Sequence, residues 1–288
     1  MVVVTFLWSI AGVVARQLES AHGFELTFWR SSFNAMFLAF SLGLVARRPL
    51  RREIVQGGQM LWVSGAMWAV MYTCFMVALT LTTVANVLIT MSIAPLLTAL
   101  LARMVFGQHI RTTTWCAIAA AGVGIGWMFV HDVANDARHL LGTAVASGVP
   151  LAAAVNWLVI QHAARSHQRQ RPDLLPAIFL GAVLSALVTL PLAWPLQASA
   201  SDLGWLSLLG VVQLAIPCML VVRVAHVLPA HEVALLALLE VVFGVAWAWW
   251  GANETPSHAV LTGGAIVMTA LVINSWAERR AVLTAVSR

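Results

Sequence analysis

Long apolar runs recur along this chain from one end to the other. Each is close to the length of about 20 mostly apolar residues that a helix needs to cross a bilayer, and short polar stretches separate them. With 61% hydrophobic and only 9% charged residues, the chain has too little polar surface to cover a soluble globule. The sequence therefore predicts an all-α integral membrane protein.

Ten of these runs are predicted as transmembrane helices. They cover residues 1–15, 26–46, 60–79, 84–106, 114–130, 141–163, 176–194, 203–222, 233–250 and 260–276. The shortest gap, from Thr80 to Thr83, predicts a tight turn between antiparallel neighbours. No secretory signal peptide is expected, because no basic segment precedes the first run. That run is short, which leaves open whether the protein starts further upstream.

The basic residues are distributed unevenly between the two sides of the predicted bundle. All 16 are Arg, and Arg-rich short loops lie on the cytoplasmic side of membrane proteins. One side holds only Arg16 and Arg138. The other side holds Arg47, Arg48, Arg51, Arg52, Arg103, Arg111, Arg165, Arg169, Arg171, Arg223, Arg279, Arg280 and Arg288. This asymmetry requires an even number of helices and predicts that both termini are cytoplasmic. It also accounts for the net charge of +5 without a nucleic-acid partner.

Two halves of five helices each are predicted, residues 1–140 and 141–288. An odd number of helices per half places the second half upside down relative to the first, as in many secondary transporters. A weak internal similarity supports this. The spacing from Pro95 to Gln108 equals that from Val241 to Glu254, and a Gly-containing apolar run follows each segment.

Short motifs are spread over the whole chain. They are Trp8-Ser9, Leu26 to Arg30 followed by Ala35, Ala234 to Glu240, and Ala252 to Ser257. In these motifs the chain resembles the EamA family of the drug/metabolite transporter superfamily. It departs from the family pattern at Gln108 and His109, where a Glu-Arg pair is expected, at Val241 in place of Pro, and at Asn253 in place of Gly.

The resemblance implies ten helices in two inverted repeats and a secondary carrier in a bacterial-type inner membrane. Such a carrier moves small metabolites, such as amino acids or related compounds, with export as the expected direction. The two halves would rock around a midplane cavity lined by helices one to four and six to nine, with possible coupling to protons or a counter-solute. The oligomeric state stays open. The alternative is a membrane-embedded enzyme or a non-transporting membrane partner.

Glu240 lies near the middle of the ninth predicted helix, where a carboxylate costs about 2.5–3.5 kcal/mol. It is the only acid deep in a predicted helix, whereas a membrane enzyme needs several catalytic groups at one depth. One interpretation is a proton-coupling or cation-binding acid that faces a central cavity. The other is a protonated carboxyl hydrogen-bonded to a neighbouring helix.

Arg30 lies about two turns inside the second predicted helix. Its side chain either extends to the outer interface or forms a structural pair, or it faces inward and binds a solute carboxylate through two hydrogen bonds. Asn34, one helical turn further on, shares its face.

Further polar and aromatic side chains are candidates for the wall of a solute site. Aromatic surfaces with a few polar anchors suit small organic solutes, although residues at helical spacing are often ordinary packing. The cavity candidates are Trp8, Arg30, Asn34, Trp68, Tyr72, Asn86, Thr90, Asn156, Trp157 and Gln213.

Prolines and glycines inside the predicted helices indicate irregular backbone and close packing. Pro95, Pro150 and Pro217 are candidate helix breaks, because a proline frees a backbone carbonyl that needs a new partner; simple packing kinks are the alternative. Gly122 and Gly126, four residues apart, predict close helix approach.

No cofactor and no metal are predicted. Cys74, Cys116 and Cys218 stand alone in apolar runs, so neither a disulfide framework nor a zinc site is indicated. His231-Glu232 begins a zinc-protease motif, but Leu235 occupies the position of the second His. Nothing resembles a phosphate-binding loop or a nucleophile elbow, so ATP-driven transport by this chain alone and enzymatic activity are not expected.

Overall fold

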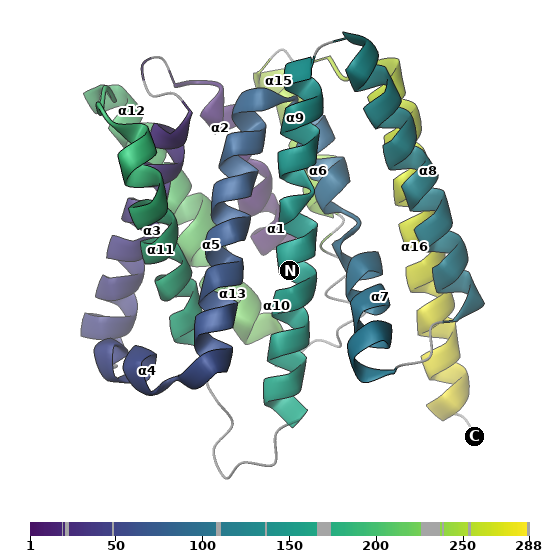
Figure 1. The fold of residues 1–288 in the computed structure, drawn as a ribbon, viewed down its shortest axis with the longest axis horizontal. Helices are drawn as coiled ribbons and strands as arrows, with labels where there is room; N and C mark the ends of the chain where they lie inside the picture. The colour runs from purple at the N-terminus through teal and green to yellow at the C-terminus, as the bar shows by residue number, and fades with distance from the viewer. Residues whose placement is uncertain are drawn as a thin grey trace.

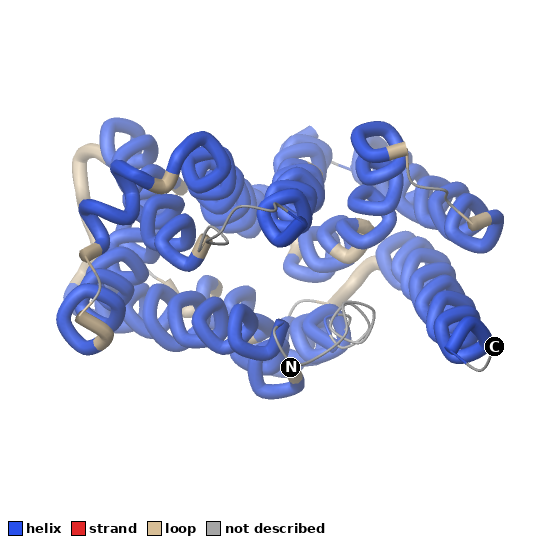
Figure 2. The backbone as a smooth tube through the Cα atoms, turned by 90° about the horizontal axis from the view of Figure 1, so that it is seen from below, coloured by secondary structure: helices blue, strands red, loops and turns tan. Residues whose placement is uncertain are grey.

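Every regular element that the structure describes is a helix (Figure 2). This computed structural model describes residues 1–18, 20, 23–47, 49–107, 111–135, 137–165, 174–225, 237, 239–252 and 255–286. The sequence predictions that concern Gln108, His109, His231, Glu232, Asn253 and Glu254 lie outside the described residues.

The helices of the first half follow the predicted apolar runs in order (Figure 1). They are α1 (Val2–Ser9), α2 (Ala11–Ala15), α3 (Phe24–Leu38), the π-helix η1 (Ala39–Val45), α4 (Leu50–Gln56), α5 (Gly58–Leu81), α6 (Val84–Met91), α7 (Ala94–Phe106) and α8 (Thr112–Asn135). The short helix α4 lies between two predicted runs and joins η1 to α5.

The second half repeats this pattern of long helices and interrupted ones. Its described helices are α9 (Ala137–Ala146), α10 (Gly148–Arg165), α11 (Leu175–Ala193), α12 (Ala200–Leu208), the π-helix η2 (Leu209–Ala215), α13 (Ile216–Ala225), α15 (Leu239–Gly251) and α16 (His258–Val286).

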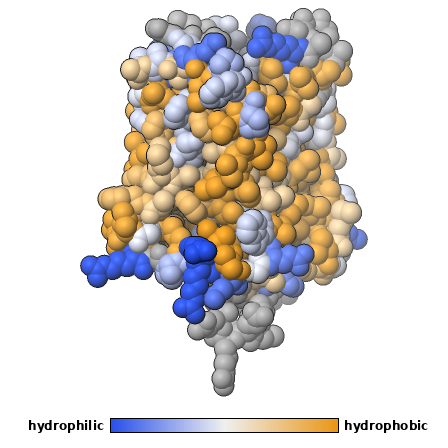
Figure 3. Space-filling model, turned by 60° about the vertical axis from the view of Figure 1, so that its left-hand side comes forward, coloured by the Kyte–Doolittle hydropathy of each residue, from blue (hydrophilic) through white to orange (hydrophobic). Residues whose placement is uncertain are grey.

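Helices long and apolar enough to cross a membrane occur in both halves. Among the described residues there are six, Gly58–Leu81, Val84–Phe106, Arg138–Ile160, Leu175–Ala193, Ala200–Val221 and His258–Ala277, and two shorter apolar helices cover Val2–Ala15 and Leu239–Gly251. On the face in Figure 3, hydrophobic residues cover most of the middle and hydrophilic residues gather at the two ends. The chain is therefore a multi-pass membrane protein, and the count of ten spans stays a prediction.

The helix contacts are paired between the two halves. The second and seventh predicted helices pack together as α3 and α11, the fourth and ninth as α6 and α15, and the fifth and tenth as α8 and α16. The third helix, α5, contacts the seventh, α11, and the eighth, α12 with η2, contacts the second, α3. Exchanging each helix for its counterpart in the other half turns the contact between the third and seventh helices into the contact between the eighth and second. The division into repeats at residue 140 stays a prediction.

Six of the described arginines lie at the ends of the bundle that the sequence predicts, while Arg48, Arg169, Arg171 and Arg288 lie outside the described residues. Arg51 and Arg52 lie on α4, Arg103 is in the last turn of α7 and Arg111 precedes α8, all toward the lower end in Figure 1. Arg16 and Arg138 lie at the other end, where Arg16 donates to the carbonyl oxygens of Leu79 (2.8 Å) and Thr82 (3.0 Å) and Arg138 to that of Thr80 (3.2 Å). Both therefore satisfy carbonyls at the C-terminus of α5, where positive charge is favourable.

Two buried carboxylates at this same end connect the two halves. Glu25, in the first turn of α3, accepts hydrogen bonds from the backbone N–H groups of Gln197 and Ala198, both at 2.8 Å. Asp202, in the first turn of α12, accepts from the N–H of Ser20 at 3.1 Å. Each half thus supplies one carboxylate that holds a loop of the other half.

The glycine contact between helices differs from the predicted one. A Cβ atom added at Gly122 or Gly126 would meet no atom of the described residues within 4 Å, so their predicted role in close packing is wrong. The contact is made by Gly124, where a Cβ would lie 2.7 Å from the carbonyl oxygen of Gly263 on α16. Glycine at both positions lets the backbones of α8 and α16 approach closely.

Candidate functional site

Five polar side chains from four helices meet in the interior of the bundle. Arg30 and Asn34 project from α3, Tyr72 from α5, Gln213 from η2 and Glu240 from α15. Hydrogen bonds join Arg30 to Gln213, and electrostatic interactions join Arg30 to Tyr72 and Glu240. We call these five residues the Arg30 cluster.

Arg30 faces the protein interior and is only 2% exposed, so its predicted extension to the outer interface is wrong. Its Nε and Nη2 atoms donate to the Oε1 atom of Gln213 at 3.2 and 2.8 Å. The guanidinium also lies 5.4 Å from the centre of the Phe75 ring, a favourable cation–π distance. Its Nη1 atom is buried and has no hydrogen-bond partner in the part of the chain that the structure describes.

The backbone around Arg30 is shaped by Gly210 in η2. A Cβ atom at this position would lie 2.7 Å from the carbonyl oxygen of Arg30 and 3.0 Å from the N–H nitrogen of Asn34. Only glycine therefore lets η2 pack directly on α3. The π-helical turn then carries Gln213 to Arg30, and the Gln213 Nε2 atom donates to the Trp8 carbonyl oxygen at 3.1 Å. Single π-turns of this kind are frequent at functional sites.

Asn34 and Tyr72 are buried next to each other, at 0% and 3% exposure. The Tyr72 hydroxyl lies near the Asn34 amide and the Cys218 thiol. Among the residues that the structure describes, neither the hydroxyl nor either polar atom of the amide has a hydrogen-bond partner with good geometry. The Trp68 ring packs at 5.5 Å from that of Tyr72, measured between ring centres. Aromatic surface and unpartnered polar atoms thus meet at one place.

Glu240 is half-buried on α15 and lies close enough to Arg30 and Cys218 for electrostatic interaction. Within the described structure no hydrogen bond joins the Glu240 carboxyl group to the Arg30 guanidinium, and the Arg30 hydrogen bonds go to Gln213. The cluster therefore holds a guanidinium and a carboxyl group that lie near each other, and among the described residues no hydrogen bond joins them directly.

Asn86 and Thr90 lie on α6, and both are buried. The Asn86 side chain donates to the Thr82 hydroxyl at 3.0 Å, and its N–H donates to the N-cap Thr83 at 3.3 Å. Asn86 thereby supports the start of the helix. The Thr90 hydroxyl has no hydrogen-bond partner and stands just before the interruption between α6 and α7.

Asn156 and Trp157 are neighbours in the chain but face different ways. The Asn156 Oδ1 atom accepts a hydrogen bond of 2.6 Å from Ser64, which joins α10 to α5. Trp157 is 41% exposed. The structure therefore places Asn156 in a helix contact and Trp157 on the outside of α10, so the two do not share one surface.

The three candidate helix breaks share one position. Pro95, Pro150 and Pro217 each stand in the first turn of a helix that follows an interruption, between α6 and α7, between α9 and α10, and at the end of η2. Pro191, in contrast, lies inside α11, and α11 is not interrupted there. The length of the apolar run alone does not predict this difference.

Sequence reasoning missed a hydroxyl network beside the cluster. The Ser185 hydroxyl on α11 lies 2.9 Å from those of Ser31 on α3 and Thr73 on α5. It also missed Cys218 and Phe75, because single Cys, Ser and Phe residues in apolar runs carry no distinguishing pattern. Ser31 lies between Arg30 and Asn34 in the sequence, but this position did not mark it as a site residue.

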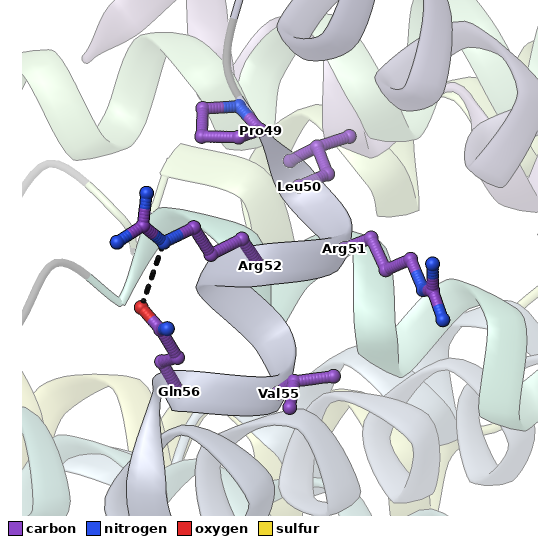
Figure 4. A pocket seen from close by; sticks show the side chains of 6 residues that line it. All are labelled: Pro49, Leu50, Arg51, Arg52, Val55 and Gln56. Carbon is purple, nitrogen blue, oxygen red and sulfur yellow. Dashed lines mark hydrogen bonds between the residues drawn. The ribbon is translucent and has the colours of Figure 1, made fainter.

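An open groove of about 510 Å³ lies on α4 at the Arg-rich end. Figure 4 shows its lining residues, among which Arg52 donates to Gln56 at 3.2 Å while Arg51 points to the other side of the helix. None of the predicted cavity residues lines this groove. The Arg30 cluster therefore remains the candidate site.

Comparison with known proteins gives concordant matches over nearly the whole chain. The model of the EamA-like transporter family matches residues 1–130 and 140–276. Two relatives, both named Pseudopaline exporter CntI and from Pseudomonas aeruginosa strains UCBPP-PA14 and PAO1, are 23% identical over 275 residues, or 94% of this chain and 93% of theirs. A solved structure described as "Crystal structure of protein" has a TM-score of 0.62 at 18% identity and covers 96% of each chain. That likeness concerns the fold alone.

Proposed function

This chain belongs to the EamA-like transporter family, and from that premise we propose that it exports small metabolites, such as amino acids or related compounds. The observation that carries the proposal is the set of buried polar atoms on Arg30, Asn34 and Tyr72 that have no hydrogen-bond partner among the described residues. Each such atom costs about 1–3 kcal/mol unless something hydrogen-bonds to it. A polar solute held between the helices supplies those partners.

The proposed transport cycle uses both halves of the chain. Trp8, Arg30 and Tyr72 come from the first predicted repeat, while Gln213 and Glu240 come from the second. If the two repeats rock against each other, the distances across this site change and it opens to one side of the membrane at a time. The paired helix contacts between the halves support such a movement.

Glu240 is the proposed coupling residue. A carboxylate inside a membrane protein is costly and is retained where it binds ions, protons or solutes. Its position beside Arg30 lets it bind a proton or the cationic part of a solute in one state of the cycle and release it in the other.

The proposed location is the bacterial inner membrane, with both termini in the cytoplasm. The concentration of arginines at one end of the bundle supports this orientation. Fusions of a cytoplasmic and a periplasmic reporter to each terminus test it. Activity of the periplasmic reporter at either terminus would contradict the proposed orientation.

Export itself is tested with the purified protein in liposomes. Vesicles loaded with a panel of labelled metabolites that includes all 20 standard amino acids should release at least one of them faster than protein-free vesicles do. The release should saturate with concentration and depend on a proton or solute gradient. If no compound shows saturable, protein-dependent release, the proposal fails.

A further inference from the structure

We propose that the Arg30 cluster recognises zwitterionic solutes, with the Arg30 guanidinium binding a carboxylate and the Glu240 carboxylate binding an ammonium group of the same molecule. This inference rests on the proposed export function and deepens it by naming the chemical class of the solute. The hydrogen bonds and unpartnered donor of Arg30, together with the proximity of Glu240 to Arg30, support it.

The Arg30 side of the cluster is ready to bind an anion. Nε and Nη2 donate to Gln213, which is a neutral amide, so the hydrogen bonds orient the guanidinium without neutralising its charge. Nη1 is buried and no described residue hydrogen-bonds to it. Arginine donors of this kind bind carboxylates with strong, directional hydrogen bonds.

Asn34 provides both a donor and an acceptor beside Arg30. It stands one helical turn from Arg30 on the same helix, and both its Nδ2 and Oδ1 atoms are buried without partners. The Nδ2 group suits a carboxylate and the Oδ1 atom suits an ammonium group. The Tyr72 hydroxyl beside it can serve either role.

Glu240 supplies the complementary negative charge. It interacts electrostatically with Arg30 but is not hydrogen-bonded to it. A solute that carries both charges pairs with both side chains. A solute that carries only one charge leaves either Arg30 or Glu240 without a compensating charge in a low-dielectric interior. This free-energy penalty weakens the binding of singly charged solutes.

The test compares matched solutes that differ only in charge. The purified protein is screened in detergent for thermal stabilisation by the 20 standard amino acids, since a ligand that binds only the folded state raises apparent stability. The best binder is then compared with its decarboxylated amine and with the acid in which hydrogen replaces the ammonium group. We expect each analogue to bind about tenfold or more weakly than the amino acid.

Two conservative variants assign the ends of the solute. In Glu240→Gln the preference for the amino acid over the ammonium-free acid should fall by about tenfold, and in Arg30→Gln the preference over the amine should fall equally. Arg51→Gln, at an exposed position on α4, is the matched control and should keep both preferences. Because each preference is a ratio measured on one sample, a smaller folded fraction does not change it.

The outcomes separate this inference from the export function. Analogues that bind as well as the amino acid, or the absence of binding by any of the 20, would overturn the zwitterion site. Saturable export of metabolites with a single charge would also overturn the zwitterion site, but it would support the proposed export function. Selective binding of amino acids without flux of any compound would support the site and refute export.

Discussion

The Arg30 guanidinium donates two hydrogen bonds to a single atom, the Oε1 of Gln213, at 3.2 and 2.8 Å. This contact joins α3 of the first half to η2 of the second. It holds a buried cation in one orientation, and it leaves Nη1 for another partner. The Arg30–Gln213 pair therefore contributes to the stability of the fold and also orients Arg30 in the proposed solute site.

Replacing Gln213 with Leu should destabilise the protein by about 3 kcal/mol or more, because two hydrogen bonds to a buried charge are lost. Chemical unfolding in detergent measures this change. Gln56→Leu is the matched control, since Gln56 accepts one exposed hydrogen bond from Arg52, and it should change stability by less than about 0.5 kcal/mol. Equal effects of the two variants would contradict the structural role assigned to Gln213.

Asn34→Leu should keep or raise stability while it lowers transport, because the Asn34 amide has no partner to lose. Asn156→Leu is the comparison, since Asn156 is equally buried but accepts a hydrogen bond from Ser64. It should cost about 1–3 kcal/mol. Thermal unfolding and liposome flux are measured on both variants. A large stability loss in Asn34→Leu would mean that Asn34 is a structural residue.

Gly124→Ala should destabilise the contact between α8 and α16, because the new methyl group would lie 2.7 Å from the carbonyl oxygen of Gly263. Such overpacking costs about 1–3 kcal/mol. Gly126→Ala meets no atom within 4 Å, and alanine's helix propensity should leave stability unchanged or raise it by up to about 1 kcal/mol. Unfolding curves measure the stability of both variants. If Gly126→Ala were less stable than Gly124→Ala, α8 would be rotated differently.

Glu25→Gln should loosen the loop that begins after α11. The carboxylate holds the N–H groups of Gln197 and Ala198 at 2.8 Å, and a neutral amide oxygen accepts such bonds less strongly. Hydrogen exchange of peptides covering residues 194–199 should accelerate, while peptides from α16 serve as the internal reference. Unchanged exchange in this loop would show that the carboxylate does not hold it.

The sequence predicted where the helices lie better than which way they face. Run length sets the position of a spanning helix, so the run predicted at 84–106 coincides with Val84–Phe106. Lipid-exposed and buried faces are both apolar, however, and no polar face reveals the rotation. This is why Gly122 and Gly126 were expected in a contact that Gly124 makes.

The candidate site was predictable only where a residue is costly inside a membrane. Arg30, Asn34 and Glu240 stand out for that reason, and the structure brings them together. Cys218 and Ser185 are compatible with any apolar helix, so their contacts depend on tertiary packing. The inward direction of Arg30 likewise follows from its bonds to Gln213.

The central claim is that the Arg30 cluster is the solute site of an exporter. Exchange of labelled for unlabelled amino acids across proteoliposomes tests it, with wild type, Arg30→Gln and Arg51→Gln compared at equal amounts of folded protein. Wild type and Arg51→Gln should exchange at least one amino acid at similar rates, and Arg30→Gln should be slower by about tenfold or more. Exchange by Arg30→Gln at the wild-type rate would contradict the claim.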